Sequence, residues 1–434
     1  MNSGHPDPVR ISAVRGGQVD RKVAEEQPAP GALDHWVAAQ LAGRLDESKV
    51  RVALWDEPPP RVADTEGPVT LRFGDSGALR QLVINPDLNF GDLYSAGRIT
   101  VHGCLTKLLG EAFRFREKSR MRGWLRRSTR SVTPSLTDSR RNIHHHYDIG
   151  NEFYRLWLDT AGLQYTCAYY ADPGMTLEEA QVAQMHQVCR KLRLQPGDRV
   201  VEAGSGWGGF AVFMAKHYGA RVRSFNISKQ QIAWSREWAE RENLGDRLEF
   251  VEDDFRNITG EYDAFVSIGM LEHVGTGNYR DMGGLINRVL TPEGRGLIHT
   301  IGRDRPFPLN AWIDRRIFPG AYPPTLREMM DLFEPNGLSV LDVENIRLHY
   351  AETLRAWLER FEKNAEAVSA MFDEAFVRAW RLYLAGSVEA FEHGTLQLFQ
   401  VAFARTGANQ IPWTREHIYA PTPETDRPAG SRDG

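Results

Sequence analysis

The sequence is poor in cysteine, has no long hydrophobic run and carries no large excess of either charge. Its three cysteines, Cys104, Cys167 and Cys189, are too few and too scattered for a disulfide framework or a zinc cluster, so we expect a reducing, cytoplasmic environment. No run of about 18 apolar residues is present, which argues against a transmembrane helix. Residues 1–30 contain no apolar core, so we expect no secretory signal. A formal net charge of −4 argues against a generally basic nucleic-acid-binding protein.

The composition that remains is that of an ordinary globular chain. The 434 residues are 41% hydrophobic and 25% charged, which fits two or three folded domains. Both ends, 1–30 and 421–434, are rich in Pro, Gly and charge, and we predict that they are disordered tails. Residues 32–113 are predicted to form a small mixed α/β domain. Its expected elements are a helix at 32–45, strands at Val50–Trp55, Val69–Phe73 and Leu82–Ile84, and helices at Phe90–Ile99 and Leu105–Phe113.

A basic segment follows this first domain. Residues 114–141 hold ten Arg or Lys, opposed only by Glu117 and Asp138, and we predict a basic linker over 114–145. A solvated connector is one interpretation. Electrostatic attachment to an anionic surface is the other, since lipid head groups contribute about 1 kcal/mol for each Lys or Arg near them. By sequence alone, nucleic-acid phosphate would attract the segment equally well.

Strand and helix patterns alternate from residue 146 onward. This alternation predicts a doubly wound, mainly parallel α/β sheet, within a catalytic domain at 146–420. The expected strands are Arg199–Glu202, Arg221–Asn226, Leu248–Glu252, Ala264–Ile268 and Gly296–Thr300. The expected helices between them are Phe210–His217, Lys229–Glu242 and Tyr279–Val289. A helical region at 353–392 and a strand at Gln397–Ala404 complete the pattern.

A glycine-rich loop follows the first of these strands and opens a helix. Gly204, Gly206 and Gly209 satisfy the spacing G-x-G-x-x-G, which alone is a weak signal for a dinucleotide. The acid that would bind a nicotinamide cofactor's ribose is absent, because the second strand ends at Asn226. Glu202 places negative charge just before the loop, where a pyrophosphate would be repelled. A cationic adenosyl ligand without phosphate, such as S-adenosylmethionine, fits better than a dinucleotide or a turn that binds nothing.

Five sequence motifs, taken together and in this order, resemble those of one family. They are His146-Tyr147-Asp148-x-Gly150-Asn151-x-Phe153-Tyr154, Gln164-Tyr165-Thr166-Cys167-Ala168-Tyr169-Tyr170, Gly204-Ser205-Gly206-Trp207-Gly208-Gly209, Gly269-Met270-Leu271-Glu272-His273-Val274-Gly275 and His299-Thr300-Ile301-Gly302. The chain from 146 to about 405 resembles the cyclopropane-fatty-acyl-phospholipid synthases and the mycolic acid cyclopropane synthases. Residues 32–113 resemble the small N-terminal domain of the phospholipid-acting members.

The resemblance implies a class I methyltransferase-like sheet with a helical cover over an acyl channel. It also implies transfer of the methyl group of S-adenosylmethionine to a cis double bond of an unsaturated phospholipid acyl chain, which forms a cyclopropane ring with bicarbonate as general base. An anionic membrane surface at the inner face of the cell membrane and a homodimer are further expectations; nucleic acid and metal are not. Relatives that make methylene- or methyl-branched chains provide an alternative, and an inactive paralogue that binds cofactor or membrane provides another.

The family's functional positions carry over residue by residue. The implied catalytic residues are Cys167, Glu272, His299, Ile301 and Tyr350, with Cys167 and Ile301 acting mainly through backbone groups. The implied cofactor contacts are Tyr165, Thr166, Glu202, Gly204, Gly206, Asn226, Gln231 and Phe255. In this scheme His299 and Tyr350 donate hydrogen bonds to bicarbonate and Glu272 accepts its hydroxyl.

Simpler interpretations remain for several of these residues. Glu272 could belong to an ordinary strand-to-helix cap, and His299 could be a satisfied core histidine. Glu202, Thr166 and Tyr170 stand where the family usually has Asp, Ser and an aromatic Trp or Phe. Adjacent histidines at 144–146 do not share a face, so a metal site there is not expected.

Overall fold

The computed structural model describes residues 28–46, 49–58, 67–122 and 149–419, with side chains described only as far as residue 116 in the segment that ends at 122. The predicted tails lie almost wholly outside the described residues, as do the linker beyond residue 122 and the histidines at 144–146. The chain divides into two compact units.

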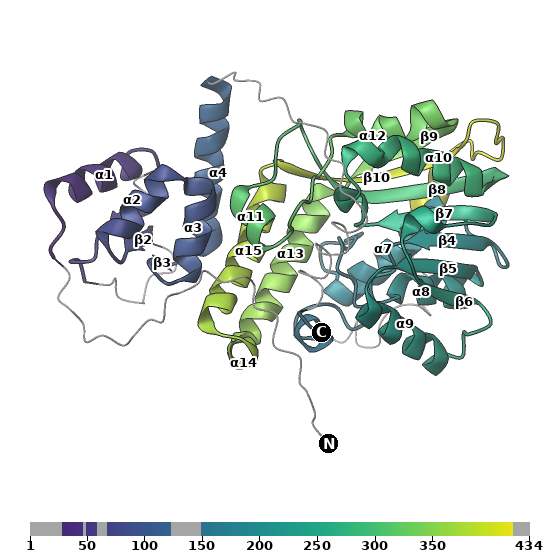
Figure 1. Cartoon of the computed structure of the whole chain (residues 1–434), viewed down its shortest axis with the longest axis horizontal. Helices are drawn as coiled ribbons and strands as arrows, with labels where there is room; N and C mark the ends of the chain where they lie inside the picture. The colour runs from purple at the N-terminus through teal and green to yellow at the C-terminus, as the bar shows by residue number, and fades with distance from the viewer. Residues whose placement is uncertain (1–27, 47–48, 59–66, 123–148, 420–434) are drawn as a thin grey trace. The chain divides into compact units, whose positions relative to one another are not determined.

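The first unit is built on a three-stranded sheet in the order β1-β2-β3, with β1 parallel and β3 antiparallel to β2 (Figure 1). The strands are β1 (Val50–Ala53), β2 (Val69–Phe73) and β3 (Ile99–His102), and the helices around them are α1 (Ala32–Ala42), α2 (Ser76–Ile84), α3 (Pro86–Ser95) and α4 (Leu105–Arg122). Phe73, Leu79 and Ile99 are fully buried in the core of this unit. Residues 32–113 thus contain both strands and helices, as the pattern predicts, and their extent as a separate domain stays a prediction.

Two element predictions in this unit were wrong. Leu82–Ile84, predicted as a strand, is the last turn of α2, which begins where the Asp75 side chain accepts a hydrogen bond from the Ala78 N–H. Short apolar runs do not distinguish strand from helix, and here Leu79 and Leu82 face the core at helical spacing. The helix predicted over Phe90–Ile99 begins at Pro86 and ends at Ser95, so Ile99 starts β3 instead.

The basic segment also differs from its prediction at its start. Residues 114–122 are not a linker but the last turns of α4, which reaches Arg122. Lys and Arg are good helix formers, and no Gly or Pro interrupts the chain between residues 111 and 122. Arg114 pairs with Glu111, and Arg116 lies 3.0 Å from Asp87, so part of the predicted basic charge is neutralised within the first unit.

Two later stretches of sequence, 309–319 and 357–393, also belong to the first unit. They contribute α11 (Ala311–Arg316), the end of α13 (Arg347–Lys363), α14 (Ala365–Met371) and α15 (Glu374–Glu392). Trp312 packs on the bare Cα of Gly91, where a Cβ would come within 2.4 Å of the indole. The Arg316 guanidinium forms two hydrogen bonds with Asp92, at 3.0 and 2.9 Å. The helices predicted at 353–392 are confirmed, and one of them, α15, packs with α3 and α4.

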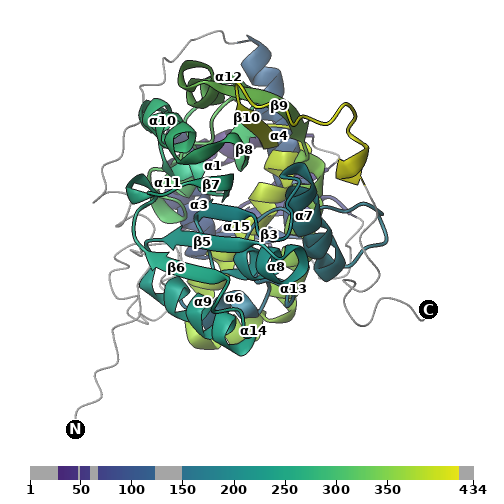
Figure 2. The same cartoon turned by 90° about the vertical axis from the view of Figure 1, so that its right-hand side faces the viewer.

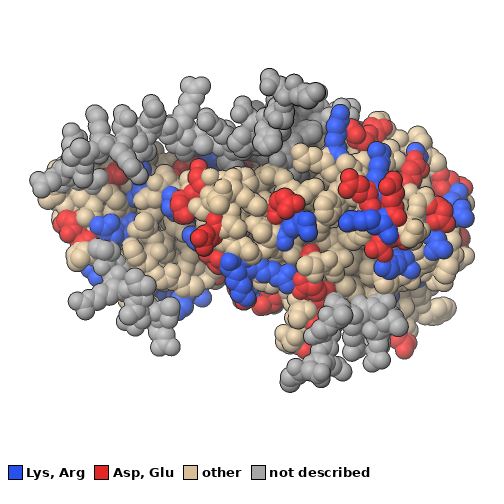
Figure 3. Space-filling model, turned by 90° about the horizontal axis from the view of Figure 1, so that it is seen from below, with Lys and Arg blue, Asp and Glu red and all other residues tan. Residues whose placement is uncertain are grey.

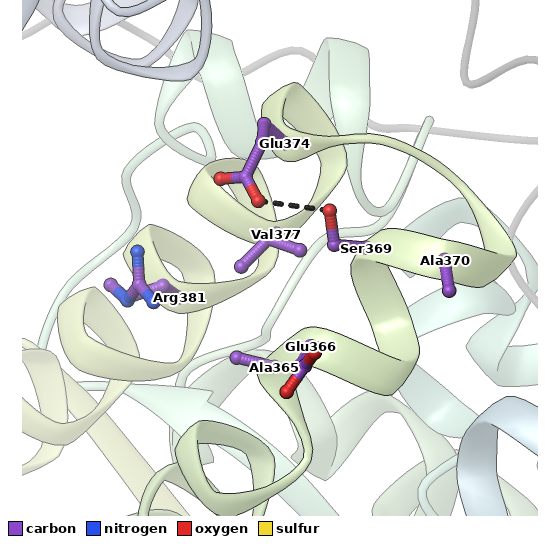
Figure 4. Close-up of a pocket in the computed structure, with 7 residues that line it drawn as sticks. All are labelled: Ala365, Glu366, Ser369, Ala370, Glu374, Val377 and Arg381. Atoms are coloured by element: carbon purple, nitrogen blue, oxygen red, sulfur yellow. Dashed lines mark hydrogen bonds between the residues drawn. The ribbon is translucent and has the colours of Figure 1, made fainter.

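A surface pocket of about 520 Å³ lies between α14 and α15 of this unit (Figure 4). Ser369 donates a 2.8 Å hydrogen bond to Glu374 across it, and Arg381 donates to Glu362 at 2.7 Å. Ser369, Glu374 and Arg381 therefore already have partners, and none of the residues predicted for catalysis or cofactor binding lines the pocket.

The second unit contains a seven-stranded sheet in the order β6-β5-β4-β7-β8-β10-β9. The strands are β4 (Arg199–Ala203), β5 (Arg221–Asn226), β6 (Leu248–Glu252), β7 (Tyr262–Ile268), β8 (Leu290–Arg303), β9 (Leu338–Asn345) and β10 (Leu396–Arg405). From β6 through β8 the pairs are parallel, while β10 runs antiparallel between β8 and β9. Each strand predicted after residue 146 is present, whereas the edge strand β9 was not predicted.

Helices cover both faces of this sheet, as the two views of Figures 1 and 2 show. One face carries α7 (Leu177–Lys191), α8 (Gly209–Tyr218) and α9 (Lys229–Arg241), and the other carries α10 (Tyr279–Val289) and α12 (Leu326–Phe333). Val200 faces the first layer and Val201 the second, as strand alternation requires. The doubly wound prediction is confirmed.

The strand order reverses between β4 and β7. Strands β4, β5 and β6 extend in one direction from this point, and β7 and β8 extend in the other. Open α/β sheets bind ligands outside the carboxyl ends of the strands at such a reversal. The residues that follow β4 and β7, and those at the carboxyl end of β8, are therefore where a site is expected.

No helix among the described residues is both long and apolar enough to cross a bilayer. On the face shown in Figure 3, described basic and acidic side chains lie interspersed.

Candidate active site

The glycine loop after β4 lies at the point where the strand order of the sheet reverses. Gly204, Gly206 and Gly208 have φ angles of +95°, +50° and +84°, which favour glycine. A Cβ at Gly206 would meet no atom within 4 Å, whereas one at Gly204 would lie 3.3 Å from Met270. The loop thus leaves open space above Gly206, as a ligand lying against the backbone requires.

Asn226, at the end of β5, holds the loop in shape. Its Nδ2 group donates to the Gly206 carbonyl at 3.2 Å and to Gln231 Oε1 at 2.9 Å. The other end of the Gln231 amide, Nε2, is buried and has no hydrogen-bond partner among the described residues. An unsatisfied buried donor is costly unless a ligand or water accepts from it. Asn226 and Gln231 therefore fit the prediction of a ligand such as S-adenosylmethionine at this loop.

Glu202 lies directly beneath the loop and is almost completely buried. It pairs in register with Ser224 on β5, whose hydroxyl donates to its carboxylate. Burial raises the pKa of Glu202 to about 7, and the Ser224 hydrogen bond opposes this shift. A cation bound nearby would favour the ionised carboxylate, so a sulfonium and Glu202 would stabilise each other.

The segment that carries Tyr165 and Thr166 is fixed against the start of α8. The buried Asp159 carboxylate accepts hydrogen bonds from the Gly162 N–H at 2.6 Å and the Gln164 N–H at 2.7 Å. A Cβ on Gly209 would come within 2.1 Å of the Gly162 carbonyl, so the segment can pack this closely against α8 only because residue 209 is glycine. Sequence reasoning missed Asp159, although an acid followed by glycine three residues later is a recognisable turn signal.

Two aromatic residues predicted to contact the cofactor lie in defined surroundings. The Tyr165 ring packs against Tyr154 and Trp157, with centroid distances of 5.5 and 5.3 Å. Phe255 follows β6, and the Arg256 guanidinium lies 5.0 Å from its ring centroid. Tyr165 and Phe255 thus have local packing partners. Their contacts with the cofactor stay predictions.

Glu272 follows β7 and reaches across to the end of β8. Its Oε1 accepts a 2.5 Å hydrogen bond from the Ile301 backbone N–H. Its Oε2 is buried and has no hydrogen-bond partner among the described residues. Burial raises the pKa of Glu272 to about 7, and the hydrogen bond from the Ile301 N–H opposes this shift. An ordinary strand-to-helix cap would use its carboxylate on helix N–H groups, whereas Glu272 binds a neighbouring strand and keeps one oxygen available.

His299, two residues before Ile301 on β8, has a partner at each ring nitrogen. Its Nε2 lies 3.2 Å from the Thr166 hydroxyl, and its Nδ1 lies 3.2 Å from the Gln400 amide nitrogen. Burial, with the nearby Lys191 charge, lowers the pKa of His299 to about 3, so the ring is neutral at physiological pH. The structure thus brings Thr166, predicted to bind cofactor, together with His299, predicted to act in catalysis.

Cys167 and Tyr350 lie on two segments that hydrogen bonds hold together. The backbone N–H of Ala168 donates to the Thr353 hydroxyl at 3.0 Å, and that of Tyr170 donates to His349 at 3.0 Å. Both Cys167 and Tyr350 are buried. Burial raises the pKa of the Cys167 thiol, so the sulfur is not a thiolate nucleophile.

Several polar residues near His299 were missed from the sequence. The buried face of α7 carries Gln181, Gln184, Gln187 and Lys191, and Gln400 lies opposite on β10. Gln181 donates to the Thr166 carbonyl at 2.9 Å, and Lys191 donates to Gln400 at 2.6 Å. Three glutamines and a lysine at helical spacing among apolar residues were the available signal, because polar residues at core positions usually serve a specific hydrogen bond.

The comparison with known families matches residues 135–401, more than half of the chain, to the mycolic acid cyclopropane synthetase family. The chain belongs to this family. Its catalytic unit therefore has a class I methyltransferase fold, and the protein is an S-adenosylmethionine-dependent C-methyltransferase of the cyclopropane-synthase type. Both the fold class and the enzyme class predicted from the sequence are confirmed.

Three relatives illustrate the range of the family. The cyclopropane-fatty-acyl-phospholipid synthase of Escherichia coli is 37% identical over 267 residues, covering 61% of this chain and 68% of that protein. The tuberculostearic acid methyltransferase of Mycobacterium tuberculosis is 31% identical over 397 residues, covering 85% and 92%. The crystal structure of a mycolic acid cyclopropane synthase with S-adenosylhomocysteine bound superposes with a TM-score of 0.59 at 28% identity, covering 63% of this chain and 99% of that one.

Proposed function

We propose that this enzyme transfers the methyl group of S-adenosylmethionine to a cis double bond of an unsaturated acyl chain in a membrane phospholipid and forms a cyclopropane ring. The observation that carries the proposal is the Glu272 carboxyl, which has one oxygen fixed by Ile301 and the other buried without a partner among the described residues. The 37% identity to a bacterial cyclopropane-fatty-acyl-phospholipid synthase supports the choice of substrate.

The chemistry explains why an oriented acceptor is needed. The alkene π pair forms a bond to the methyl carbon while the sulfur–methyl bond breaks, which leaves a positive charge on the other alkene carbon. A base then removes a proton from the new methyl group, and the released electron pair closes the ring. S-adenosylmethionine supplies the electrophilic methyl when bound; the glycine loop, Asn226 and Gln231 hold it in line with the double bond.

Bicarbonate fits the residues at the end of β8 as the base. It is an anion with two acceptor oxygens and one hydroxyl donor. The buried Oε2 of Glu272 can accept that hydroxyl, while His299, Tyr350 and the backbone at Cys167 would supply polar groups for the oxygens. The Ile301 N–H would act indirectly, by holding Glu272 Oε1. When bound, bicarbonate would supply a proton acceptor, and Glu272 would set its orientation.

The decisive experiment is NMR and mass spectrometry of lipids from cells that express the enzyme. We expect monounsaturated phospholipid chains to gain the mass of one methylene, to lose olefinic protons and to acquire upfield cyclopropyl protons. The matched control expresses Glu272→Gln, which should leave the lipids unchanged. Unchanged lipids with the wild-type enzyme, under conditions where it binds S-adenosylmethionine, would refute the proposal.

A second product class has its own support. The tuberculostearic acid methyltransferase aligns over 85% of this chain, farther than the relatives that match only the catalytic region. In such a reaction a hydride shift moves the positive charge to the carbon that carries the new methyl group, and loss of a proton from that methyl group leaves a methylene-branched chain. A methyl-branched chain forms only if a separate hydride donor then reduces the methylene double bond. Vinylidene protons in the same NMR spectra would identify the methylene product in place of the cyclopropane. An inactive paralogue, the remaining alternative, would give neither signal and no cofactor turnover on vesicles.

We further propose that the enzyme works as a peripheral protein at the inner face of the cell membrane and that the basic segment at 114–141 binds anionic lipid. Each Lys or Arg near such a surface contributes about 1 kcal/mol, and this attraction weakens as salt screens it. Neutralising Arg120, Arg122, Arg126 and Arg127 together should weaken binding to anionic vesicles, most strongly at low salt. Unchanged sedimentation with vesicles would identify the segment as a connector only.

A further inference from the structure

A buried row of polar side chains crosses three strands beside the proposed site. Gln400 on β10 pairs in register with His299 on β8 and with Glu344 on β9. Register partners on neighbouring strands project from the same face of the sheet, so these three side chains form one line. His299 and Gln400 are almost fully buried, and burying polar groups is unfavourable unless each finds a partner. The row therefore requires a specific hydrogen-bond arrangement.

Lys191, from α7, fixes the orientation of the Gln400 amide. Its side chain is completely buried, and its ammonium donates to Gln400 Oε1 at 2.6 Å and to Glu344 Oε2 at 2.5 Å. Because an ammonium can only donate, Gln400 must turn its carbonyl oxygen toward Lys191. Burial lowers the pKa of Lys191, while the charges of Glu344 and Asp342 oppose that shift and favour the ammonium.

The other end of the same amide then determines the state of His299. Once Oε1 faces Lys191, the NH₂ group of Gln400 faces His299 Nδ1 at 3.2 Å. An amide NH₂ can only donate, so Nδ1 must be the acceptor nitrogen of the ring. The proton of a neutral imidazole is then on Nε2, which lies 3.2 Å from the Thr166 hydroxyl.

We propose that Lys191 and Gln400 are positioning residues that hold His299 as its Nε2–H tautomer and so present a hydrogen-bond donor beside Thr166. This inference rests on the proposed function only for the use of that donor: in the proposed reaction it binds an oxygen of the anion that Glu272 orients. A ring held in the opposite tautomer would offer a lone pair there and repel the same oxygen.

Gln400→Glu is the sharpest variant, because it keeps the shape of the side chain and its contact with Lys191. A carboxylate can only accept, so His299 must donate from Nδ1 and lose the Nε2–H tautomer. Gln187→Leu is the matched control. Gln187 is equally buried and donates to Glu344 at 3.1 Å, but it bonds to neither His299 nor Gln400 in the structure.

The test is long-range proton–nitrogen NMR of the full chain with ¹⁵N-labelled histidine, in which the His299 signals are those absent from His299→Gln. We expect the Nε2–H pattern in the wild type and in Gln187→Leu, and the Nδ1–H pattern in Gln400→Glu. An Nδ1–H pattern in the wild type would overturn the proposal even if no variant folds. The same tautomer in the wild type and in folded Gln400→Glu would also overturn it.

Kinetics provide the second measurement. Gln400→Glu should lower kcat by about 10- to 100-fold, as changes behind a functional imidazole commonly do, without changing the KM for S-adenosylmethionine. An unchanged kcat, or an equal effect of Gln187→Leu, would show that the row has only a structural role. The NMR measurement needs no turnover, so an absence of lipid product in the wild type would refute the proposed function and leave the tautomer test intact.

Discussion

The glycine loop after β4 and the edge formed by the ends of β7 and β8 are both polar, but their polar groups are arranged in opposite ways. In the loop, Asn226 forms hydrogen bonds with the Gly206 carbonyl and with Gln231, whose buried Nε2 donor has no partner among the described residues. At the edge, Glu272, His299 and Gln400 come from three strands or strand ends, and Glu272 keeps an oxygen without a partner among the described residues. The loop therefore offers a donor and the edge an acceptor, and we expect the loop to bind the cofactor while the edge acts in the reaction.

The largest expected effect is on turnover. Glu272→Gln should lower kcat by about 10²- to 10⁴-fold, because a neutral amide cannot serve as the charged acceptor that orients the base. The affinity for S-adenosylhomocysteine, measured by calorimetry, should stay nearly unchanged. Glu202→Gln is the control from the other region, since this residue is equally buried and also has a pKa near 7. Glu202→Gln should reduce the affinity for cofactor by a larger factor than it reduces kcat. If Glu272→Gln lost affinity and turnover equally, the assignment of the edge to the reaction would be wrong.

The second effect is a pH-dependent change in stability. Burial raises the folded-state pKa of Glu202 from 4.5 to about 7, so folding favours the protonated form. This contribution is fully present below about pH 4.5 and is lost as the pH rises through 7. Glu202→Gln cannot ionise, so its unfolding free energy relative to wild type should rise by roughly 2 kcal/mol between pH 5 and pH 8. Urea titrations at the two pH values measure this; a constant difference would mean that Glu202 does not titrate in this range.

The third effect concerns the loop alone. Gly204→Ala places a Cβ at a φ of +95° and 3.3 Å from Met270, which strains the backbone by about 1–2 kcal/mol. We expect weaker binding of S-adenosylhomocysteine with kcat at saturation largely kept. Gly197→Ala is the matched control, because Gly197 has a φ of +90° and open space around its Cα but lies before β4. Gly197→Ala should lose stability but not affinity for S-adenosylhomocysteine. A loss of affinity as large as that of Gly204→Ala would show that the loop is not what binds the cofactor.

The smallest effect is expected at Cys167. Its thiol is buried and its pKa is raised, so we expect it to contribute to the site through its backbone. Cys167→Ala should keep kcat near the wild-type value and lose about 1 kcal/mol of stability through the small cavity. The control is Cys189→Ala, an equally buried thiol that is not among the predicted site residues. A large loss of kcat confined to Cys167→Ala would show that the sulfur itself takes part in the reaction.

Local pattern was enough to predict the parallel strands of the second unit and three of its helices. Strands β4 to β7 and helices α8 to α10 agree with the structure to within a few residues, whereas β8 begins at Leu290 instead of Gly296, and α7 and α12 were not predicted. The strand predicted at Leu82–Ile84 was wrong, because three apolar residues fit either periodicity. Strand β9 was not predicted, because acidic residues such as Asp342 and Glu344 interrupt its apolar pattern, as is typical of an edge strand. The helix through Arg122 was not predicted, because a run of basic residues is typical of a linker, although Lys and Arg are also good helix formers.

The sequence by itself determined strands β4 to β8, helices α8 to α10, the glycine loop and the family, because each of these depends on motifs whose residues are close together in the chain. Only the tertiary structure decided that α11 and α15 pack with the N-terminal helices, since their partners lie far away in sequence. The same holds for the row of Lys191, Gln400 and His299. Its members are separated by about a hundred residues or more, and hydrogen bonds between them exist only after strand register and helix packing bring them together.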